Sequence, residues 1–176
     1  MVLQHGWAHR SHAFPGQKKI ELGGSATPDA NRPLLAIGSQ LLKDAFGVQY
    51  LSVLVPPWNR IDAHHRELIK CQGYAALSTF ASSAKHSNMY PIPTIDTHID
   101  AIDWRHGARF KSFFELQSAA DHHIASGAPT VGLLTHHLEH DEVAFGVLER
   151  FATYVARHSR ARWVGIDDLL ERGVGR

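Results

Sequence analysis

The chain has 176 residues, which suits one domain with a sizeable hydrophobic core, and we expect a single domain over residues 1–176. Hydrophobic residues make up 44% of the sequence, charged residues make up 20%, and the formal net charge is +1, so neither a disordered chain nor a protein that binds nucleic acid is indicated. Because no apolar run approaches the roughly 20 residues that span a bilayer, and because the N-terminal segment lacks the apolar core of a signal peptide, we expect a cytoplasmic protein with no membrane partner.

Short apolar runs alternate with helical patterns along the chain. The runs that predict buried strands are residues 1–3, 50–55, 74–77, 93–95 and 130–134, with a further candidate at 163–166. The helical patterns begin near Pro33 and end before Gly47, run from the capping residue Asp62 to Gly73, and cover residues 113–127 and 141–158. Segments 11–32 and 78–93 have no strong periodicity and are predicted to be loops. This alternation predicts a parallel α/β sheet or barrel.

Polar side chains follow the C-terminal ends of four predicted strands, in segments 4–9, 56–60, 96–105 and 135–141. In parallel sheets and α/β barrels, active sites are built on that edge. The four segments together therefore predict a functional site.

The first of these segments contains His5 and His9, two of 14 histidines in the chain. Two imidazoles suit zinc, cobalt, nickel or iron(II), usually with a carboxylate as a further ligand. In a chain so rich in histidine, most imidazoles are expected to be surface side chains, so the spacing alone is weak evidence for a metal site.

The second segment, Pro56-Pro57-Trp58-Asn59-Arg60, is a turn stiffened by two prolines. It exposes an aromatic ring beside a guanidinium, an arrangement that suits a sugar ring. The alternative is a stiff loop in which Trp58 merely packs.

The last two segments contain acid–base groups. Either Asp100 or Asp103, next to Trp104, could orient a histidine as part of a carboxylate–imidazole pair. His136 follows a strand and is a candidate general acid. The alternative for the two aspartates is a solvated turn.

Taken in order, these segments resemble the polysaccharide deacetylase family, also called NodB-like or carbohydrate esterase family 4-type. The His-(Ser/Thr)-x-x-His motif of that family is similar to residues 5–9, with Gly6 in place of the hydroxyl residue. Later motifs resemble Pro57-Trp58, residues 100–104 and residues 133–136. The resemblance covers nearly the whole chain.

The resemblance implies a partial, distorted (β/α) barrel that lacks the first βα units of the family fold. It implies a hydrolase that acts on non-peptide C–N or acetyl ester bonds and removes acetyl groups from a carbohydrate or small N-acetylated substrate through metal-bound water. His5 and His9 would hold a divalent metal, with zinc expected first and cobalt, nickel or iron as alternatives.

The resemblance also implies roles for the later motifs. His136 would protonate the leaving group and would be oriented by Asp103. The substrate would contact the turn that follows the second strand and a later tryptophan. These residues are Pro57, Trp58, Asn59, Arg60 and Trp104.

Two features depart from the family pattern. The aspartate pair that precedes the His motif in the family, and supplies the base and a third metal ligand, has no counterpart before His5, so we expect a chain that is N-terminally truncated relative to the family. In the family, an arginine precedes the proline of the motif that Pro57-Trp58 resembles; here Val55 replaces it, and Arg60 could substitute for it. Unpaired sheet edges would then invite pairing with another copy of the chain, as a homo-oligomer.

Two other hypotheses remain open. One is a catalytically impaired protein of the deacetylase fold that binds carbohydrate without turnover. The other is a different barrel metallohydrolase that uses His98 or His137 as a ligand.

Overall fold

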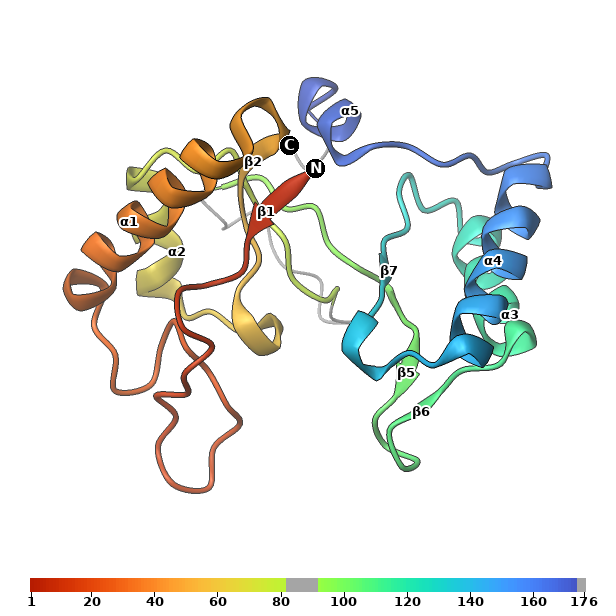
Figure 1. Cartoon of the computed structure of the whole chain (residues 1–176), viewed down its shortest axis with the longest axis horizontal. Helices are drawn as coiled ribbons and strands as arrows, with labels where there is room; N and C mark the ends of the chain where they lie inside the picture. The colour runs from red at the N-terminus through yellow and green to blue at the C-terminus, as the bar shows by residue number, and fades with distance from the viewer. Residues whose placement is uncertain (82–91, 174–176) are drawn as a thin grey trace. The chain divides into compact units, whose positions relative to one another are not determined.

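The structure is a computed structural model that describes residues 1–81 and 92–173. The chain divides into two compact units. Unit 1 consists of Met1–Asp96 and Gly165–Arg176, and unit 2 is Thr97–Val164 (Figure 1). The single domain expected from the chain length remains a prediction.

Unit 1 is built on a parallel sheet with strand order β1-β2-β3. Its elements are β1 (Val2–Gln4), α1 (Pro28–Phe46), the 3-10 helix η1 (Gly47–Gln49), β2 (Tyr50–Leu54), the 3-10 helix η2 (Pro57–Asn59), α2 (Ala63–Cys71), β3 (Ala76–Leu77) and α5 (Ile166–Glu171). Helix α1 packs against β1 and β2, with α2 beside it (Figure 1).

Local sequence signals explain both ends of the long helix α1. Thr27 caps it by accepting a hydrogen bond from the Ala30 amide, and Pro28 occupies the first turn, where no amide donor is needed. The helix therefore begins before Pro33, which lies inside it. Pro33 is tolerated because the carbonyl that it leaves without an amide partner, that of Asp29, lies in an exposed first turn that water can reach. The predicted end before Gly47 is confirmed.

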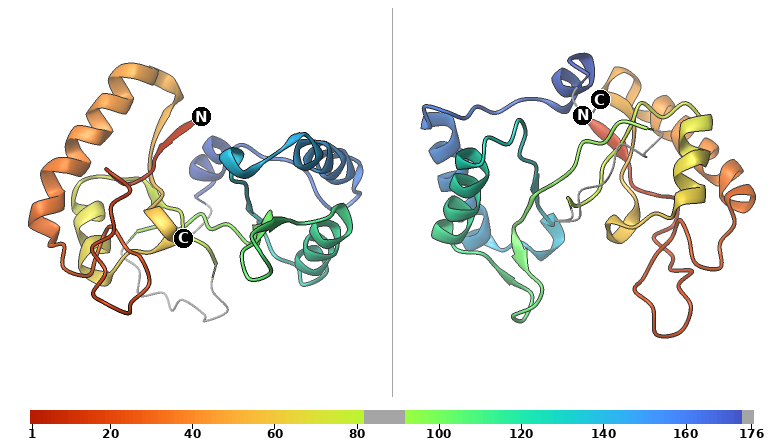
Figure 2. Two further views of the ribbon diagram at one scale, coloured as in Figure 1. Left: turned by 60° about the horizontal axis from the view of Figure 1, so that its bottom comes forward. Right: turned by 180° about the vertical axis from the view of Figure 1, so that it is seen from behind.

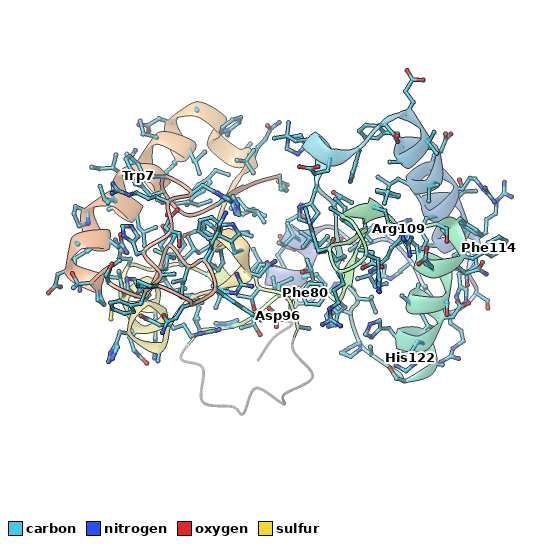
Figure 3. The ribbon with its side chains drawn as sticks, turned by 90° about the horizontal axis from the view of Figure 1, so that it is seen from below. Trp7, Phe80, Asp96, Arg109, Phe114 and His122 are labelled. Carbon is cyan, nitrogen blue, oxygen red and sulfur yellow. The ribbon has the colours of Figure 1, made fainter. Side chains whose placement is uncertain are left out.

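The buried polar side chain of Gln4 joins the end of β1 to α1. Its amide nitrogen donates to the carbonyls of Gly6 and Leu35, each at 3.2 Å, and its oxygen accepts from the Tyr74 hydroxyl at 2.6 Å. Gly38 of α1 makes this approach possible, because a Cβ there would lie 2.6 Å from the Gln4 amide nitrogen. The Trp7 ring lies beside the same helix, 3.4 Å from where a Cβ of Gly38 would be (Figure 3).

Unit 2 contains two short strand pairs and two long helices. Its elements are β4 (Ile99–Asp100), β5 (Ile102–Asp103), β6 (Arg109–Phe110), α3 (Phe113–Ala125), β7 (Leu133–Leu134), the 3-10 helix η3 (His137–Glu139) and α4 (Glu142–Arg157). Strand β4 pairs with β7 in parallel, and β5 pairs with β6 as an antiparallel hairpin. Figure 2 shows α3 and α4 side by side in both views.

Helices α3 and α4 begin where the sequence provides caps. Ser112 and Glu115 form a reciprocal capping box at α3, and the Asp141 side chain accepts from the Ala144 amide at α4. The buried faces of the two helices meet Ile99 of β4 in a core that also includes Leu116 and Phe151.

The mixed α/β class and the parallel strands at 1–3, 50–55 and 74–77 are confirmed, whereas the prediction of a strand at 163–166 is wrong. Residues 163–165 are irregular and Ile166 begins α5, whose first turn carries the acidic residues Asp167 and Asp168. The run at 93–95 forms only an isolated bridge, from Thr94 to Leu77, and the run at 130–134 is a strand only at 133–134. Most of the predicted loop 78–93 lies outside the described residues.

The barrel geometry remains a prediction, because the sheets formed by the described residues are small and not closed. Pairing of copies through exposed sheet edges also remains a prediction. Within residues 1–81 and 92–173, no helix is both long and apolar enough to cross a membrane.

Candidate functional site

The pairing of β1 with β2 places His5 beside Val55. Gln4 is in register with Leu54, so the next residues of the two parallel strands leave the sheet side by side. The His5 ring nitrogen Nδ1 lies 2.9 Å from the Val55 carbonyl oxygen. A carbonyl only accepts, so Nδ1 carries the proton and the lone pair of Nε2 is left for another partner. Partial withdrawal of the ring from water lowers the pKa of His5, against the opposing effect of this hydrogen bond, and favours the neutral form that binds metals.

His9 approaches His5 from the end of the same loop. The two ring centroids lie 5.3 Å apart, with the ring planes inclined at 44°. Two imidazoles bound to one tetrahedral metal, with each nitrogen about 2 Å from the ion, have centroids about 5 Å apart. The spacing and chemistry of the pair therefore fit two ligands of one ion.

The loop between the two histidines is folded around the carboxylate of Glu21, which is buried. Glu21 accepts hydrogen bonds from the amides of Trp7 at 2.5 Å, Ala8 at 3.4 Å and Arg10 at 3.1 Å. Three amides on one carboxylate bend the chain so that His9 turns back toward His5. No sequence pattern marks Glu21, because it lies in an irregular segment far from its partners along the chain.

Gly6 is required by this loop. Its φ is +61°, and a Cβ there would lie 2.6 Å from the Pro57 ring and 2.7 Å from the Glu21 carboxylate. The glycine that replaces the hydroxyl residue of the resembled motif therefore has a steric reason. It also explains the burial of Pro57, whose ring fills the space that a side chain would take.

Trp58 forms an aromatic wall beside His9, with ring centroids 4.4 Å apart. The Lys19 ammonium lies 5.8 Å from the centre of the Trp58 ring. Both Trp58 and Asn59 have φ of +56°, a strained conformation for a bulky residue such as tryptophan. Strain of this kind is maintained only where the surroundings fix it.

Arg60 ties the turn to the loop that carries Glu21. Its guanidinium donates to the Lys19 carbonyl oxygen at 3.0 Å. In unit 1 the structure thus brings together His5, His9, Pro57 and Trp58, while Asn59 and Arg60 support the turn. Across residues 1–81 and 92–173, no three His, Cys, Asp or Glu side chains lie close enough together to hold a metal ion.

Strand register also explains the second cluster, in unit 2. Asp100 of β4 is in register with Leu134 of β7, so Asp100 and His136, two residues beyond Leu134, point to the same face. The His136 nitrogen Nε2 lies 3.2 Å from an Asp100 carboxylate oxygen. The other Asp100 oxygen accepts from the Trp104 indole nitrogen at 2.9 Å. The Trp104 ring meets the His136 ring edge-on, with centroids 5.1 Å apart.

The expectation that Asp103 orients His136 is not met by this geometry, because Asp100 makes that contact. Asp103 lies on the β5–β6 hairpin and faces the His106 ring nitrogen Nδ1 at 2.7 Å and the Arg109 guanidinium at 3.4 Å. The hydrogen bond with His106 lowers the pKa of Asp103. Arg109 also binds Glu115 at the first turn of α3 (Figure 3). Asp103 therefore holds the hairpin.

The other candidate ligands do not join either cluster. His98 accepts the Gly132 amide on Nδ1 at 3.1 Å, so its proton lies on Nε2, and its ring packs edge-on against His123. His137 is exposed. The proposal that His98 or His137 binds a metal gains no support from these positions.

A comparison with solved structures finds a similar fold in a crystal structure from Mycobacterium smegmatis, provisionally described as a polysaccharide deacetylase. The TM-score is 0.68 and the sequence identity is 16%; the match covers 96% of this chain and 60% of that one. At this identity the likeness establishes the fold alone. No protein-family profile matches the sequence, and no curated protein matches it.

Proposed function

We propose that this chain is a metal-dependent hydrolase that removes acetyl groups from a carbohydrate or a related small N-acyl substrate. The observation that carries the proposal is the His5–His9 pair, with centroids 5.3 Å apart at the end of a parallel strand. The fold similarity to a structure described as a polysaccharide deacetylase supports it.

In this proposal, His5 Nε2 and the His9 imidazole would hold a divalent metal, with zinc expected first. A metal in such a site acidifies a bound water and polarises a carbonyl oxygen. Val55 keeps the tautomer of His5 that leaves Nε2 free, and Glu21 keeps the loop bent so that His9 faces it. Neither contact involves a metal, so both would hold the pair in place before an ion binds.

Within unit 2, His136 would give a proton to the leaving nitrogen or oxygen. Asp100 holds His136 through Nε2, which leaves Nδ1 as the ring nitrogen available to a substrate. The carboxylate partner fixes the orientation of the imidazole. Trp104, held by the same carboxylate and half exposed, offers an aromatic face to a sugar or an acetyl group.

The alternative is a protein of this fold that binds carbohydrate without turnover. The observation that favours it is the Trp58 ring, whose centroid lies 4.4 Å from that of His9 and 5.8 Å from the Lys19 ammonium, and which would bind a sugar ring with or without catalysis.

Acetate release from acetylated chito-oligosaccharides by the full, zinc-loaded chain tests the proposal. We expect release by the wild type and by His64→Ala, a control that removes an exposed histidine on α2, and loss of release in His9→Ala and His136→Ala. Sugar binding without release in all of them would support the alternative. Neither release nor binding would overturn both functions.

A further inference from the structure

Three hydrogen bonds fix the position of His136. Its carbonyl accepts from the Glu139 amide at 2.8 Å, within the turn of η3. Its ring binds Asp100 at 3.2 Å. Its amide donates to the ring nitrogen Nε2 of His140, at 3.1 Å. Only the last of these bonds ties the backbone of His136 to a side chain.

That bond determines the tautomer of His140. Because Nε2 accepts the N–H of His136, Nε2 carries no proton of its own. The neutral ring must therefore carry its proton on Nδ1. Nδ1 is buried and has no hydrogen-bond partner within residues 1–81 and 92–173. A buried donor without a partner lowers the stability of the folded chain, so a histidine at this position is destabilising in that respect.

Two aromatic side chains contact the His140 ring. Its centroid lies 4.9 Å from that of Phe110 and 5.4 Å from that of Phe145, both in edge-on contacts. A leucine or phenylalanine would suit these neighbours without an unpaired donor. The feature that only the imidazole supplies is the acceptor for the His136 amide.

His140 also keeps this acceptor when its neighbour is charged. Desolvation lowers the pKa of His140, and the positive charges of His136 and His137 lower it further, while Asp141 acts in the opposite direction. A proton on His136 therefore disfavours a proton on His140 and leaves the Nε2 lone pair on the amide.

We propose that His140 is a positioning residue for His136: its Nε2 accepts the His136 amide and fixes the backbone from which the His136 ring reaches Asp100. This inference rests on the proposed function in assigning His136 a role in catalysis. Without the acceptor, the peptide before His136 is free to rotate and the ring moves relative to Asp100. Misplacement of a reacting group by about 1 Å can lower a rate a hundredfold.

Three variants of the full chain test the role through acetate release. His140→Leu keeps the apolar contacts and removes the acceptor, and we expect kcat to fall at least about tenfold with little change in KM. His140→Gln restores an acceptor oxygen at a similar distance from the backbone, and we expect it to recover most of kcat. His137→Leu, which replaces an exposed histidine of the same loop, is the matched control and should match the wild type.

A measurement of the hydrogen bond itself separates this inference from the proposed function. In the ¹⁵N-labelled wild-type chain, we expect a scalar coupling across the bond between the His136 amide nitrogen and His140 Nε2. The coupling, or faster exchange of the His136 amide in His140→Leu than in His140→Gln, supports the contact even if the wild type releases no acetate. Absence of the coupling, or equal kcat in the leucine and glutamine variants, would overturn the positioning role.

Discussion

The two clusters of candidate site residues are built in different ways. In unit 1, the backbone does most of the positioning: His9, Trp58 and Asn59 all have positive φ, and three amides converge on the buried Glu21 carboxylate. In unit 2, strand register brings Asp100 to His136, and bonds from side chains hold them. The corresponding strained residue in unit 2, Ala108, lies in the turn of the hairpin.

This difference has a physical consequence. A loop folded around one buried carboxylate loses its shape and its stability together when that carboxylate is removed. A cluster held by side chains at strand ends can lose one contact while the strands stay paired. Mutations in unit 1 should therefore change stability and ligand binding together, and mutations in unit 2 should separate them.

The largest effect is expected for Glu21→Ala. It leaves the amides of Trp7, Ala8 and Arg10 without their acceptor, and we expect the free energy of unfolding to fall by about 2–4 kcal/mol. Urea unfolding monitored by fluorescence measures this change. Glu67→Gln, on the exposed face of α2, is the control and should stay close to the wild type. An equal, small effect of both variants would contradict the account of the loop.

The next largest effect concerns Asp100 and Asp103. Asp100→Asn removes the carboxylate that holds His136, and we expect acetate release to fall on the order of a hundredfold with little change in unfolding free energy. Asp103→Asn weakens only the hairpin contacts with His106 and Arg109 and should keep most of the activity. A larger loss of kcat in the Asp103 variant would contradict the assignment of Asp100 as the residue that orients His136.

A smaller effect is expected from pH at the start of α3. Hydrogen bonds from the Arg109 guanidinium and from Ser112 lower the pKa of Glu115 in the folded chain. A depressed folded pKa contributes stability above the unfolded value of about 4.3, and that stability is lost as the pH falls below it. Because both side chains are well exposed, solvent screens the pair and the contribution is small.

Glu115→Gln tests this contribution. The variant should lose stability near neutral pH and should show a weaker decline in unfolding free energy than the wild type as the pH falls below about 4. Urea unfolding at a series of pH values measures both. Parallel curves for the two proteins would show that the ion pair does not contribute.

The smallest effect is expected for Ala108→Gly. Ala108 has φ of +53° in the β5–β6 turn, where glycine avoids the clash of a Cβ, and we expect a gain of about 0.5 kcal/mol in unfolding free energy. The same change at Trp58 would remove the aromatic wall, whereas in the turn of unit 2 the strain can be relieved without loss of the site. Thermal unfolding measures the gain; a loss of stability would show that the turn is not strained.

Local signals in the sequence predicted much of the fold. The Asp62 cap, the acidic start and basic end of α4, and the apolar runs before His5 and His136 each act over a few residues, and each element formed where these signals lie. Signals at Thr27-Pro28 and at the acidic pair after Ile166 were also local, and they identify the starts of α1 and α5 that apolar periodicity missed.

The contacts within the clusters could not be predicted in the same way. Asp100 and Asp103 are only three residues apart in the sequence. Which of them contacts His136 depends on the register of β4 with β7. Glu21 contacts its amides across an irregular loop, and His140 contacts the amide of His136 through a turn that no periodic pattern marks. Such contacts depend on tertiary structure, so they emerged only with the fold.

The central claim is that His5 and His9 bind one metal ion. Calorimetric titration of the full chain with zinc tests it most directly, with His5→Ala, His9→Ala and the exposed-site control His64→Ala measured alongside. We predict one zinc bound per chain in the wild type and in the control, and loss of that binding in each of the other two variants. Equal zinc binding by all four proteins, or no zinc binding by the wild type, would contradict the claim.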